Sequence, residues 1–321
     1  MREPRFFQLH QLDAAPLVAE AQAGLLQPQA QASPKFFYDA LGSSLFDAIT
    51  ELDEYYPTRT EAAILREQGP ALAQAVLTAV GPQATMVDLG AGNCAKAARL
   101  LQPLALARYI AVDISVGFLR ESLAQLQGQH PALDMVGVGL DFSAQLVLPP
   151  GLITGPSLVF YPGSSIGNFT PDAALQLLRQ ARELSQGGAL LIGVDLVKPA
   201  PLLELAYDDP LGVTAAFNLN LLRHLNRLLG ADFDPRQWQH VALYNAAAGR
   251  IEMHLQARSP QTVRWPGGER RFTAGERIHT ENSYKWQRAD FEALLRDAGF
   301  AKVQTFTDAL GWFALTLASH A

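Results

Sequence analysis

The fold is decided by the stretch Thr85-Met86-Val87-Asp88-Leu89-Gly90-Ala91-Gly92-Asn93-Cys94-Ala95-Lys96. It begins with an apolar run that favours a β-strand, turns at two glycines and continues into a helix-forming segment. Such a unit is typical of the start of a doubly wound α/β sheet, in which the first helix points its N–H groups at a ligand. Glycine lets the backbone turn sharply and approach a ligand closely. We therefore predict that Gly90 and Gly92 bind a cofactor, although a turn without a ligand would share the pattern.

Further apolar runs follow in regular alternation with helical segments. The predicted strands cover residues 85–89, 109–113, 135–140, 157–161 and 189–196. Near-continuous apolar strands are expected where helices cover both faces of a parallel sheet. The pattern stops after residue 198 and resumes at residue 286, with a helix over 289–298 and a hairpin of strands 302–307 and 313–318. We therefore expect an α/β, Rossmann-like domain of residues 59–198 and 286–321, and a second α+β lobe of residues 1–58 and 199–285.

Several local elements are expected outside the repeating strands. Helical patterns cover residues 11–27, a short segment after Ser43 and Ser44, and residues 62–80, where Thr60 would provide the N-cap. Two strands over residues 250–256 and 262–265 are expected to pair with each other across a turn near Ser259-Pro260.

Composition narrows the classes of function. The chain has 321 residues, is 17% charged and carries a net charge of −6, which argues against nucleic acid or an anionic membrane as a partner. Its only cysteine, Cys94, excludes an internal disulfide framework. No apolar run reaches the ~18 residues of a membrane span. We expect a soluble, cytoplasmic monomer that acts on a small molecule.

The choice of cofactor depends on the residues at the carboxyl ends of the strands. Asp113 ends the second strand about 20 residues after the first glycine, where a carboxylate accepts hydrogen bonds from ribose hydroxyls in NAD and S-adenosylmethionine (SAM) enzymes alike. Asp141 and Phe142 end the third strand, where an acidic group and an aromatic face can hold an adenine ring. This pair favours SAM over NAD. Solvation of Asp113 and a helix N-cap at Asp141 are the alternatives.

Other catalytic classes have weaker support. The seven histidines show no short metal-ligand spacing, and one cysteine cannot build a zinc site, so we expect no metal. Ser164 and Ser165 lack the context of a nucleophile elbow, which argues against a hydrolase. An NAD(P)-dependent oxidoreductase and a module that senses SAM without turnover remain open.

Six further motifs resemble one known family, in order from about residue 33 to the C-terminus. They are Phe37-Tyr38-Asp39, Glu54-Tyr55-Tyr56-Pro57-Thr58-Arg59, Gly163-Ser164-Ser165-Ile166-Gly167-Asn168, the run 206–214, Ile251-Glu252-Met253 and Thr280-Glu281-Asn282-Ser283. The chain resembles the histidine-specific, SAM-dependent Nα-methyltransferases of ergothioneine biosynthesis, which also have two lobes. The resemblance implies three successive methyl transfers to the α-amine of L-histidine, giving hercynine. A methyltransferase of the same family acting on another amino acid or amine is the alternative.

The resemblance also implies roles for individual residues. The positions expected to bind SAM are Gly90, Lys96, Asp113, Asp141 and Phe142. The positions expected to bind histidine are Tyr55, Asn168, Tyr207, Glu281 and Ser283, with Asn282 between the last two. Tyr38 matches a tyrosine near the reacting amine, and Gly163 matches a backbone contact between cofactor and substrate.

The residue types suit this chemistry. Glu281 and Ser283, two apart in an extended segment, point to one side and can both reach one imidazole. The Asn168 amide can donate to and accept from the substrate amine and carboxylate. Tyr207 can donate to the carboxylate, and Tyr38 can interact with the amine. Phe46 and Met253 are expected to pack against the imidazole ring. We assign catalysis to Tyr38 and Asn168, the two residues expected to interact with the substrate amine.

Overall fold

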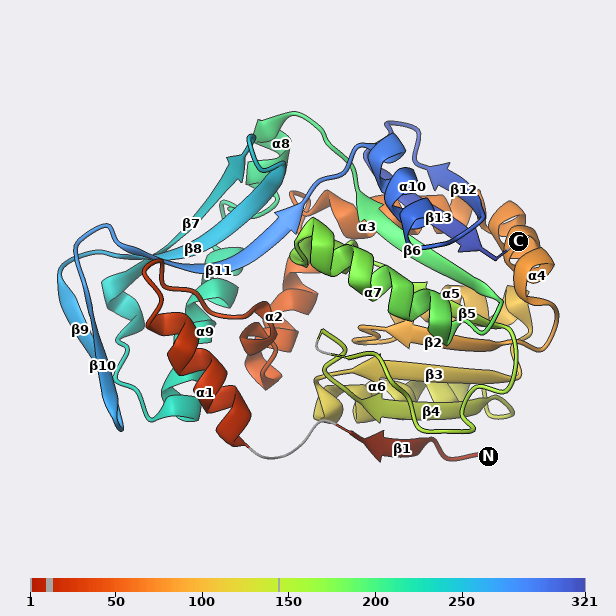
Figure 1. Cartoon of the computed structure of the whole chain (residues 1–321), viewed down its shortest axis with the longest axis horizontal. Helices are drawn as coiled ribbons and strands as arrows, with labels where there is room; N and C mark the ends of the chain where they lie inside the picture. The colour runs from red at the N-terminus through yellow and green to blue at the C-terminus, as the bar shows by residue number, and fades with distance from the viewer. Residues whose placement is uncertain (1, 10–13, 144, 321) are drawn as a thin grey trace. The chain divides into compact units, whose positions relative to one another are not determined.

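The computed structural model describes residues 2–9, 14–143 and 145–320, and they form two compact units. Unit 1 takes in residues 1–10, 57–197 and 284–321, and unit 2 takes in residues 11–56 and 198–283. Figure 1 shows the elements of each unit along the chain. No helix among the described residues combines the length and apolar character needed to cross a membrane.

Unit 1 is built on an eight-stranded sheet with the order β1-β4-β3-β2-β5-β6-β13-β12. Strand β2 pairs in parallel with β3 on one side and β5 on the other, and β13 is antiparallel to both β6 and β12. The expected doubly wound sheet is therefore confirmed, and the terminal hairpin joins its edge in antiparallel orientation. A ligand binds such a sheet beyond the carboxyl ends of β2 and its neighbours, where the strand order reverses. The strands are β1 (Arg5–Gln8), β2 (Thr85–Leu89), β3 (Arg108–Asp113), β4 (Asp134–Gly139), β5 (Ser157–Tyr161), β6 (Ala189–Asp195), β12 (Lys302–Thr307) and β13 (Phe313–Ser319).

Two apolar layers bury the faces of this sheet. Successive residues of β2 alternate between them, so that Met86 packs in the layer of α3 to α6 and Val87 in the layer of α7 and α10. Figure 1 shows α7 lying across the sheet. Burial on both faces explains why the strands read as unbroken apolar runs. The helices of unit 1 are α3 (Tyr56–Glu67), α4 (Gly69–Val80), α5 (Ala95–Leu104), α6 (Val116–Gln129), the 3₁₀ turn η2 (Ser165–Asn168), α7 (Pro171–Leu184) and α10 (Arg288–Asp297).

The segment before β2 differs from the sequence prediction. One helix over residues 62–80 was expected, but α3 ends at Glu67 and α4 begins at Gly69. The following Pro70 explains the break, because proline lacks an N–H group and its ring clashes with the carbonyl of the preceding turn. The same residue is well placed in the first turn of a new helix.

The N-terminal strand corrects the predicted domain boundaries. Residues 1–58 were assigned to the second lobe, but β1 pairs in parallel with β4, with Phe6 opposite Gly137. A Cβ atom at Gly137 would collide with the Phe6 ring, so the glycine makes room for this edge strand. The first residues of the chain therefore belong to unit 1.

Unit 2 is organised around the long helix α9 (Val213–Leu229), which buries Phe217, Leu221 and Leu225. It contacts α1, α2, η1, β7 and β8, and Phe37 of η1 stacks on Phe217 with ring centroids 4.5 Å apart. The other elements of the unit are α1 (Ala14–Leu25), η1 (Pro34–Phe37), α2 (Ala40–Thr50), α8 (Ala200–Leu205), η3 (Pro235–Gln237), β7 (Trp238–Asn245), β8 (Arg250–Ala257), β9 (Gln261–Trp265), β10 (Gly268–Phe272) and β11 (Arg277–Tyr284).

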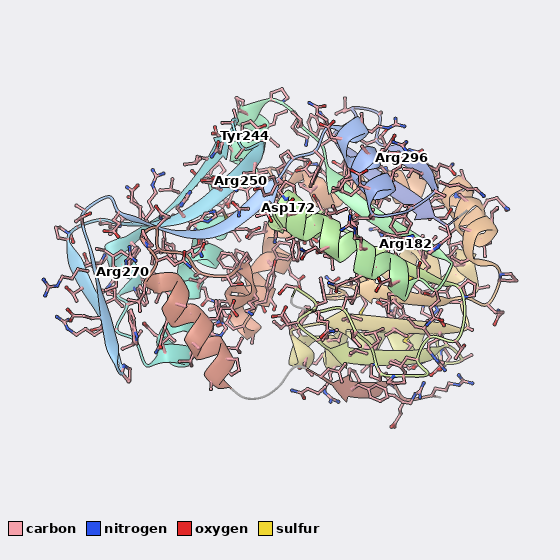
Figure 2. The ribbon with its side chains drawn as sticks, viewed as in Figure 1. Asp172, Arg182, Tyr244, Arg250, Arg270 and Arg296 are labelled. Atoms are coloured by element: carbon pink, nitrogen blue, oxygen red, sulfur yellow. The ribbon has the colours of Figure 1, made fainter. Side chains whose placement is uncertain are left out.

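The strands of unit 2 pair differently from the prediction. Strand β8 lies between β11 and β7, and β9 pairs only with β10, so the expected pairing of 250–256 with 262–265 is wrong. Each strand instead pairs with a hairpin neighbour, and Gly267, at a φ of 85°, forms the tight turn between β9 and β10. Arg270 on β10, labelled in Figure 2, donates to the Pro28 carbonyl after α1 at 3.2 Å.

Two helices of unit 2 also have an end that differs from the prediction. The predicted helix after Ser43 and Ser44 starts earlier, because Asp39 is the N-cap of α2 and accepts the Gly42 N–H at 2.7 Å. The helix predicted over residues 11–27 is α1, which ends at Leu25; residues 11–13 lie outside the described part of the chain.

Candidate functional site

The glycine turn after β2 is tied to the end of β3. Gly90 and Gly92 both have positive φ values, of 68° and 52°. The N–H of Gly92 donates to Asp113 Oδ2 at 2.9 Å, and the Ser115 N–H donates to Asp113 Oδ1 at 2.8 Å. Each carboxylate oxygen keeps a second lone pair for a ligand hydroxyl. The turn and Asp113 therefore form one preorganised group of donors and acceptors.

Asp141 and Phe142 stand at the end of β4, beside this group. A Cβ atom added at Gly90 would lie 3.9 Å from the tip of the Phe142 ring, whereas one added at Gly92 would meet nothing within 4 Å. Phe142 also packs edge-on against Tyr161 at the end of β5, with centroids 5.7 Å apart. Asp141 accepts from the N–H and hydroxyl of Ser143, and the described residues that follow it form a turn and no helix. The alternative reading of Asp141 as a helix N-cap is therefore wrong.

Lys96 and Gly163 meet at a buried carboxylate that the sequence analysis missed. Glu61 of α3 forms an ion pair with Lys96 at 2.7 Å, and its other oxygen accepts the Gly163 N–H at 2.9 Å. Its side chain is 1% exposed. Gly163 has a φ of 80°, and a Cβ there would lie 2.6 Å from Lys96 Nζ. Glu61 thus joins α5 to the loop after β5. In the sequence, its burial could have been inferred because Glu61 lies four residues after Pro57 and three before Ile64, on the same face of a helix.

Asp88 and Cys94 are structural parts of the same turn. Burial raises the pKa of Asp88 to about 7, and the Tyr109 hydroxyl donates to its Oδ2 at 2.7 Å. Burial likewise raises the pKa of the Cys94 thiol to about 12. A buried thiol of this kind is not a nucleophile.

The loop that carries Asn168 is held by a hydrogen bond to the end of β6. Ser164 has a φ of 61°, and its hydroxyl accepts the Asp195 N–H at 2.8 Å. The Asp195 carboxylate forms an ion pair with Lys285 at 2.8 Å, and both side chains are at most 1% exposed. Asn168 ends η2 and is half-buried. Asn168 and Gly163 therefore lie in unit 1, in the loop that follows β5.

Four predicted aromatic residues form a continuous row in unit 2. Tyr38 packs edge-on against Phe46 at 5.9 Å, Phe46 against Tyr55 at 6.2 Å, and Tyr55 against Tyr207 at 6.2 Å. Phe217 of α9 lies against both Tyr38 and Phe46. The fold thus joins residues that are more than 150 positions apart in sequence.

The row ends at the strand predicted to hold the substrate ring. The hydroxyls of Tyr207 and Ser283 are 2.7 Å apart, and both residues are buried. Strand β11 confirms the expected extended segment, and Glu281 is half-buried on it. Thr280 donates to the carbonyl of the buried Met253 at 3.0 Å and so ties β11 to β8.

Asn282 has different surroundings from its two neighbours. Burial lowers the pKa of His279, and the neighbouring Asn282 side chain acts against this shift. The Asn282 side chain therefore lies beside His279, whereas Ser283 meets Tyr207.

Polar contacts hold Tyr207 in place, and the sequence analysis missed them. His240 of β7 donates from Nε2 to the Tyr207 carbonyl at 2.8 Å, and its Nδ1 is 2.8 Å from the Asn218 amide. Asp209 accepts the N–H groups of Val213 and Thr214 at the start of α9. Burial would raise the pKa of Asp209, but these hydrogen bonds hold it below its ordinary value. The run 206–214 therefore fixes Tyr207 and caps α9.

The residues present in unit 1 fit a SAM-type cofactor. The open turn at Gly92, the Asp113 carboxylate and the neighbouring Asp141 and Phe142 offer groups for a backbone approach, a ribose and an adenine. All lie at the carboxyl ends of β2, β3 and β4, where such a sheet binds its ligand.

Comparison with known proteins gives matches over most of the chain. The family described as "Histidine-specific methyltransferase, SAM-dependent" matches residues 17–320. Histidine N-alpha-methyltransferase from Mycolicibacterium smegmatis is 42% identical over 95% of each chain. The protein of the same name from Mycobacterium tuberculosis is 40% identical over 94% of each chain. Ergothioneine biosynthesis protein 1 from Schizosaccharomyces pombe is 29% identical over 84% of this chain and 36% of its own length.

Proposed function

Because the chain belongs to the family of histidine-specific, SAM-dependent methyltransferases, we propose that it methylates the α-amino nitrogen of L-histidine three times, giving hercynine. One structural observation supports this most directly. The Tyr207–Ser283 hydroxyl pair joins the aromatic row to the strand that carries Glu281. Aromatic faces, hydroxyls and one carboxylate on a single unit suit a small, polar, aromatic substrate such as histidine.

Unit 1 would hold the methyl donor. SAM supplies an electrophilic methyl group on a sulfonium; each transfer forms an N–C bond, breaks the S–C bond and releases S-adenosylhomocysteine. Asp113 would accept from the ribose hydroxyls, and Asp141 and Phe142 would hold the adenine. Lys96 would act together with Glu61, because the ion pair at 2.7 Å ties it to the Gly163 backbone.

Unit 2 would hold the amino acid. We assign Glu281 and Ser283 to the imidazole nitrogens, because a carboxylate accepting from an imidazole N–H makes a charge-assisted bond of about 1.5–3 kcal/mol. Tyr207 would donate to the substrate carboxylate without placing a cation nearby. Tyr55, Phe46 and Met253 would pack around the ring. An acceptor that must be satisfied by the substrate discriminates against side chains that cannot donate to it.

The reacting nitrogen must be neutral and aligned with the methyl group for in-line displacement. The ammonium group of free histidine has no lone pair, so it must lose a proton before the first transfer, and the methylated products must lose one before the second and third. Asn168 would orient the amine and Tyr38 would receive or relay the proton. Such positioning can supply about 7–11 kcal/mol of the barrier reduction.

The test is incubation of the purified protein with SAM and L-histidine, followed by mass spectrometry. The proposal expects a product with three added methyl groups on the α-nitrogen and three equivalents of S-adenosylhomocysteine. A panel of free amino acids and amines distinguishes histidine from another substrate of the same family. Stabilisation by NADH instead of S-adenosylhomocysteine in a thermal-shift assay would support an oxidoreductase. Binding of SAM without any product would support a sensor.

We also propose that the protein acts as a monomer in the cytoplasm, without nucleic acid or membrane as a partner. The net charge of −6 and the histidine specificity of the family support the absence of nucleic acid or an anionic membrane as a partner. Gel filtration and light scattering test the oligomeric state.

A further inference from the structure

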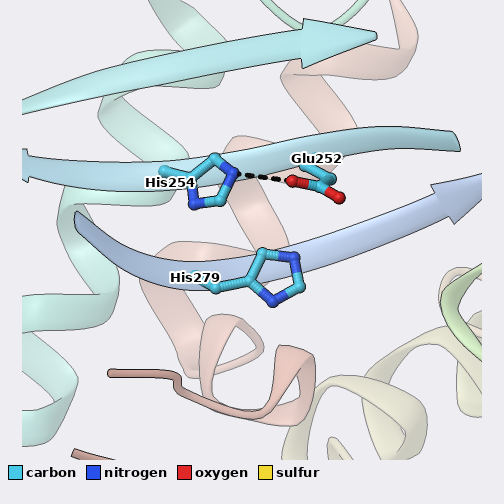
Figure 3. A group of neighbouring side chains, drawn as sticks. All are labelled: Glu252, His254 and His279. Atoms are coloured by element: carbon cyan, nitrogen blue, oxygen red, sulfur yellow. Dashed lines mark hydrogen bonds and ion pairs between the residues drawn. The ribbon is translucent and has the colours of Figure 1, made fainter. Parts of the chain in front are cut away.

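Three potential metal ligands gather on the sheet of unit 2, and none of them belongs to the proposed methyl-transfer chemistry. Glu252 and His254 lie on β8, and His279 lies on the adjacent strand β11. One ligand atom from each of these side chains lies within 4.8 Å of the others. Figure 3 shows the three side chains on the same side of the two strands.

His254 is buried, Glu252 and His279 are half-buried, and the group contains polar atoms without partners among the described residues. His254 is 7% exposed, and its Nε2 is 3.1 Å from Glu252 Oε2. His279 Nε2 is buried and has no hydrogen-bond partner within the described residues, and the same holds for Asn282 Oδ1 beside it. Buried polar atoms without partners are uncommon in folded proteins, and an ion is one of the explanations for them.

The protonation states suit a cation. Burial lowers the pKa of His254 to about 4 and lowers that of His279 as well. Burial alone would raise the pKa of Glu252, but hydrogen bonds from Arg250 and Asn245 bring it to about 2. Near neutral pH the group therefore has two neutral imidazoles and one carboxylate, which are the forms that bind metal ions.

The surrounding charges limit but do not block such a site. Arg250, whose position on β8 is labelled in Figure 2, donates to Glu252 Oε1 at 2.8 Å, so Oε2 remains directed at His254. Arg277 is also near enough to disfavour the protonated form of His254, and it bonds Gln256 at 2.9 Å. The two arginines weaken the binding of any cation. The metal ion must therefore be held by coordinate bonds to the side chains rather than by attraction to a net negative charge. That favours a metal with affinity for imidazole over calcium or magnesium.

We propose that Glu252, His254 and His279 form a binding site for a divalent transition metal of the zinc class, with Asn282 Oδ1 or water as the fourth ligand. In a tetrahedral zinc site with bonds of about 2.0–2.1 Å, ligand atoms are roughly 3.4 Å apart. Glu252 and His254 already have nearly this separation, at 3.1 Å. The His279 ligand atom lies within 4.8 Å of the other two and would have to move closer to them to complete the site. The metal would link β8 to β11 and stabilise unit 2.

This site does not depend on the proposed methyl transfer, and its test measures binding alone. Untagged full-length protein is dialysed against chelator and then titrated with Co²⁺ and with Zn²⁺. We expect one Co²⁺ per chain with the visible ligand-field bands of a tetrahedral nitrogen–oxygen site, and displacement of Co²⁺ by Zn²⁺. Zn²⁺ should also raise the melting temperature.

Variants decide whether these residues bind the metal. His254→Gln, His279→Gln and Glu252→Gln should each weaken binding at least about tenfold and remove the bands. His130→Gln, at the end of α6 in unit 1, should bind as the parent protein does. Circular dichroism confirms that each variant is folded; if His279→Gln is not, His254→Gln serves alone. Absence of binding by the parent protein, or unchanged binding in folded variants of the group, would overturn the proposal and leave a hydrogen-bonded network only.

Discussion

The residues proposed to bind the cofactor in unit 1 and those proposed to bind the substrate in unit 2 are assembled in different ways. In unit 1 the groups come from successive strand ends and are largely backbone N–H groups and carboxylates, such as Gly92 and Asp113. In unit 2 they come from helices and strands far apart in the chain and are mainly aromatic rings and hydroxyls, such as Tyr55, Tyr207 and Ser283. The first group follows from one repeated local motif. The second exists only after α2, α8 and β11 have come together.

Substitutions in the two units should therefore impair different steps of ligand binding. A change in the carboxylates and glycines of unit 1 should affect cofactor binding, and a change in the row of unit 2 should affect substrate binding. Asn168 breaks the pattern, because it lies in unit 1 and is proposed to orient the substrate. The following four changes test the division.

Replacing Asn168 with alanine should have the largest effect. Loss of amine orientation should lower kcat about 100-fold or more, because small misplacement of reacting groups costs that much. SAM affinity should stay within about twofold, because Asn168 does not contact the cofactor in this scheme. Turnover assays and calorimetry measure the two effects. Ser165→Ala, at an exposed position of the same short helix, is the control, and full activity of Asn168→Ala would assign Asn168 a structural role.

Glu281→Ala should weaken histidine binding while sparing SAM. Loss of a charge-assisted bond of about 1.5–3 kcal/mol corresponds to a roughly 10- to 150-fold increase in the histidine Kd. Titration calorimetry with each ligand checks this. Glu269→Ala, on the exposed hairpin strand β10, should change neither Kd. Equal losses for histidine and SAM would contradict the assignment of Glu281 to the imidazole.

Glu61→Gln should damage the cofactor side more than the substrate side. The change removes the charge partner of Lys96 and disturbs the acceptor of the Gly163 N–H, so we expect a loss of about 1–3 kcal/mol in stability and weaker SAM binding. Chemical denaturation and calorimetry measure both. Glu67→Gln is the matched control on α3, since its pair with Arg66 is exposed and should contribute little. Identical behaviour of the two variants would show that burial of Glu61 has no consequence.

Asp88→Asn should have the smallest effect and a defined pH dependence. The folded-state pKa of Asp88 is raised to about 7, so the folded state binds a proton that the unfolded state has lost. The parent protein should therefore lose stability as the pH rises from about 4 to 7, and the variant should not show this contribution. At pH 8 we expect a gain of about 1 kcal/mol, less than the pKa shift alone implies, because the new amide N–H needs a partner.

Melting curves at pH 5 and pH 8 compare the Asp88→Asn variant with the parent protein. Asp297→Asn, at the exposed end of α10, should show the same pH dependence as the parent. A variant that follows the parent curve across this range would mean that Asp88 titrates normally.

The sequence predicted the parts of the fold that are local and periodic. Strands such as 157–161 and the terminal hairpin are confirmed, because burial on both faces requires unbroken apolar runs. The sequence did not predict which strands pair where more than one neighbouring strand was available as a partner. The β8–β7 and β9–β10 hairpins replaced the expected pair, and a parallel edge strand at residues 5–8 had no periodic signal.

The sequence by itself determined the doubly wound sheet, the glycine turn and the identity of the family, because each depends on order and spacing along the chain. Only the tertiary structure decided the buried contact of Glu61 with Lys96 and the meeting of His254 with His279. The spacing of the histidines along the sequence predicts no metal site. Neighbouring strands bring ligands together at distances that sequence separation does not record, since hydrogen bonding sets the spacing across a sheet at about 4.8 Å whatever the length of the connection.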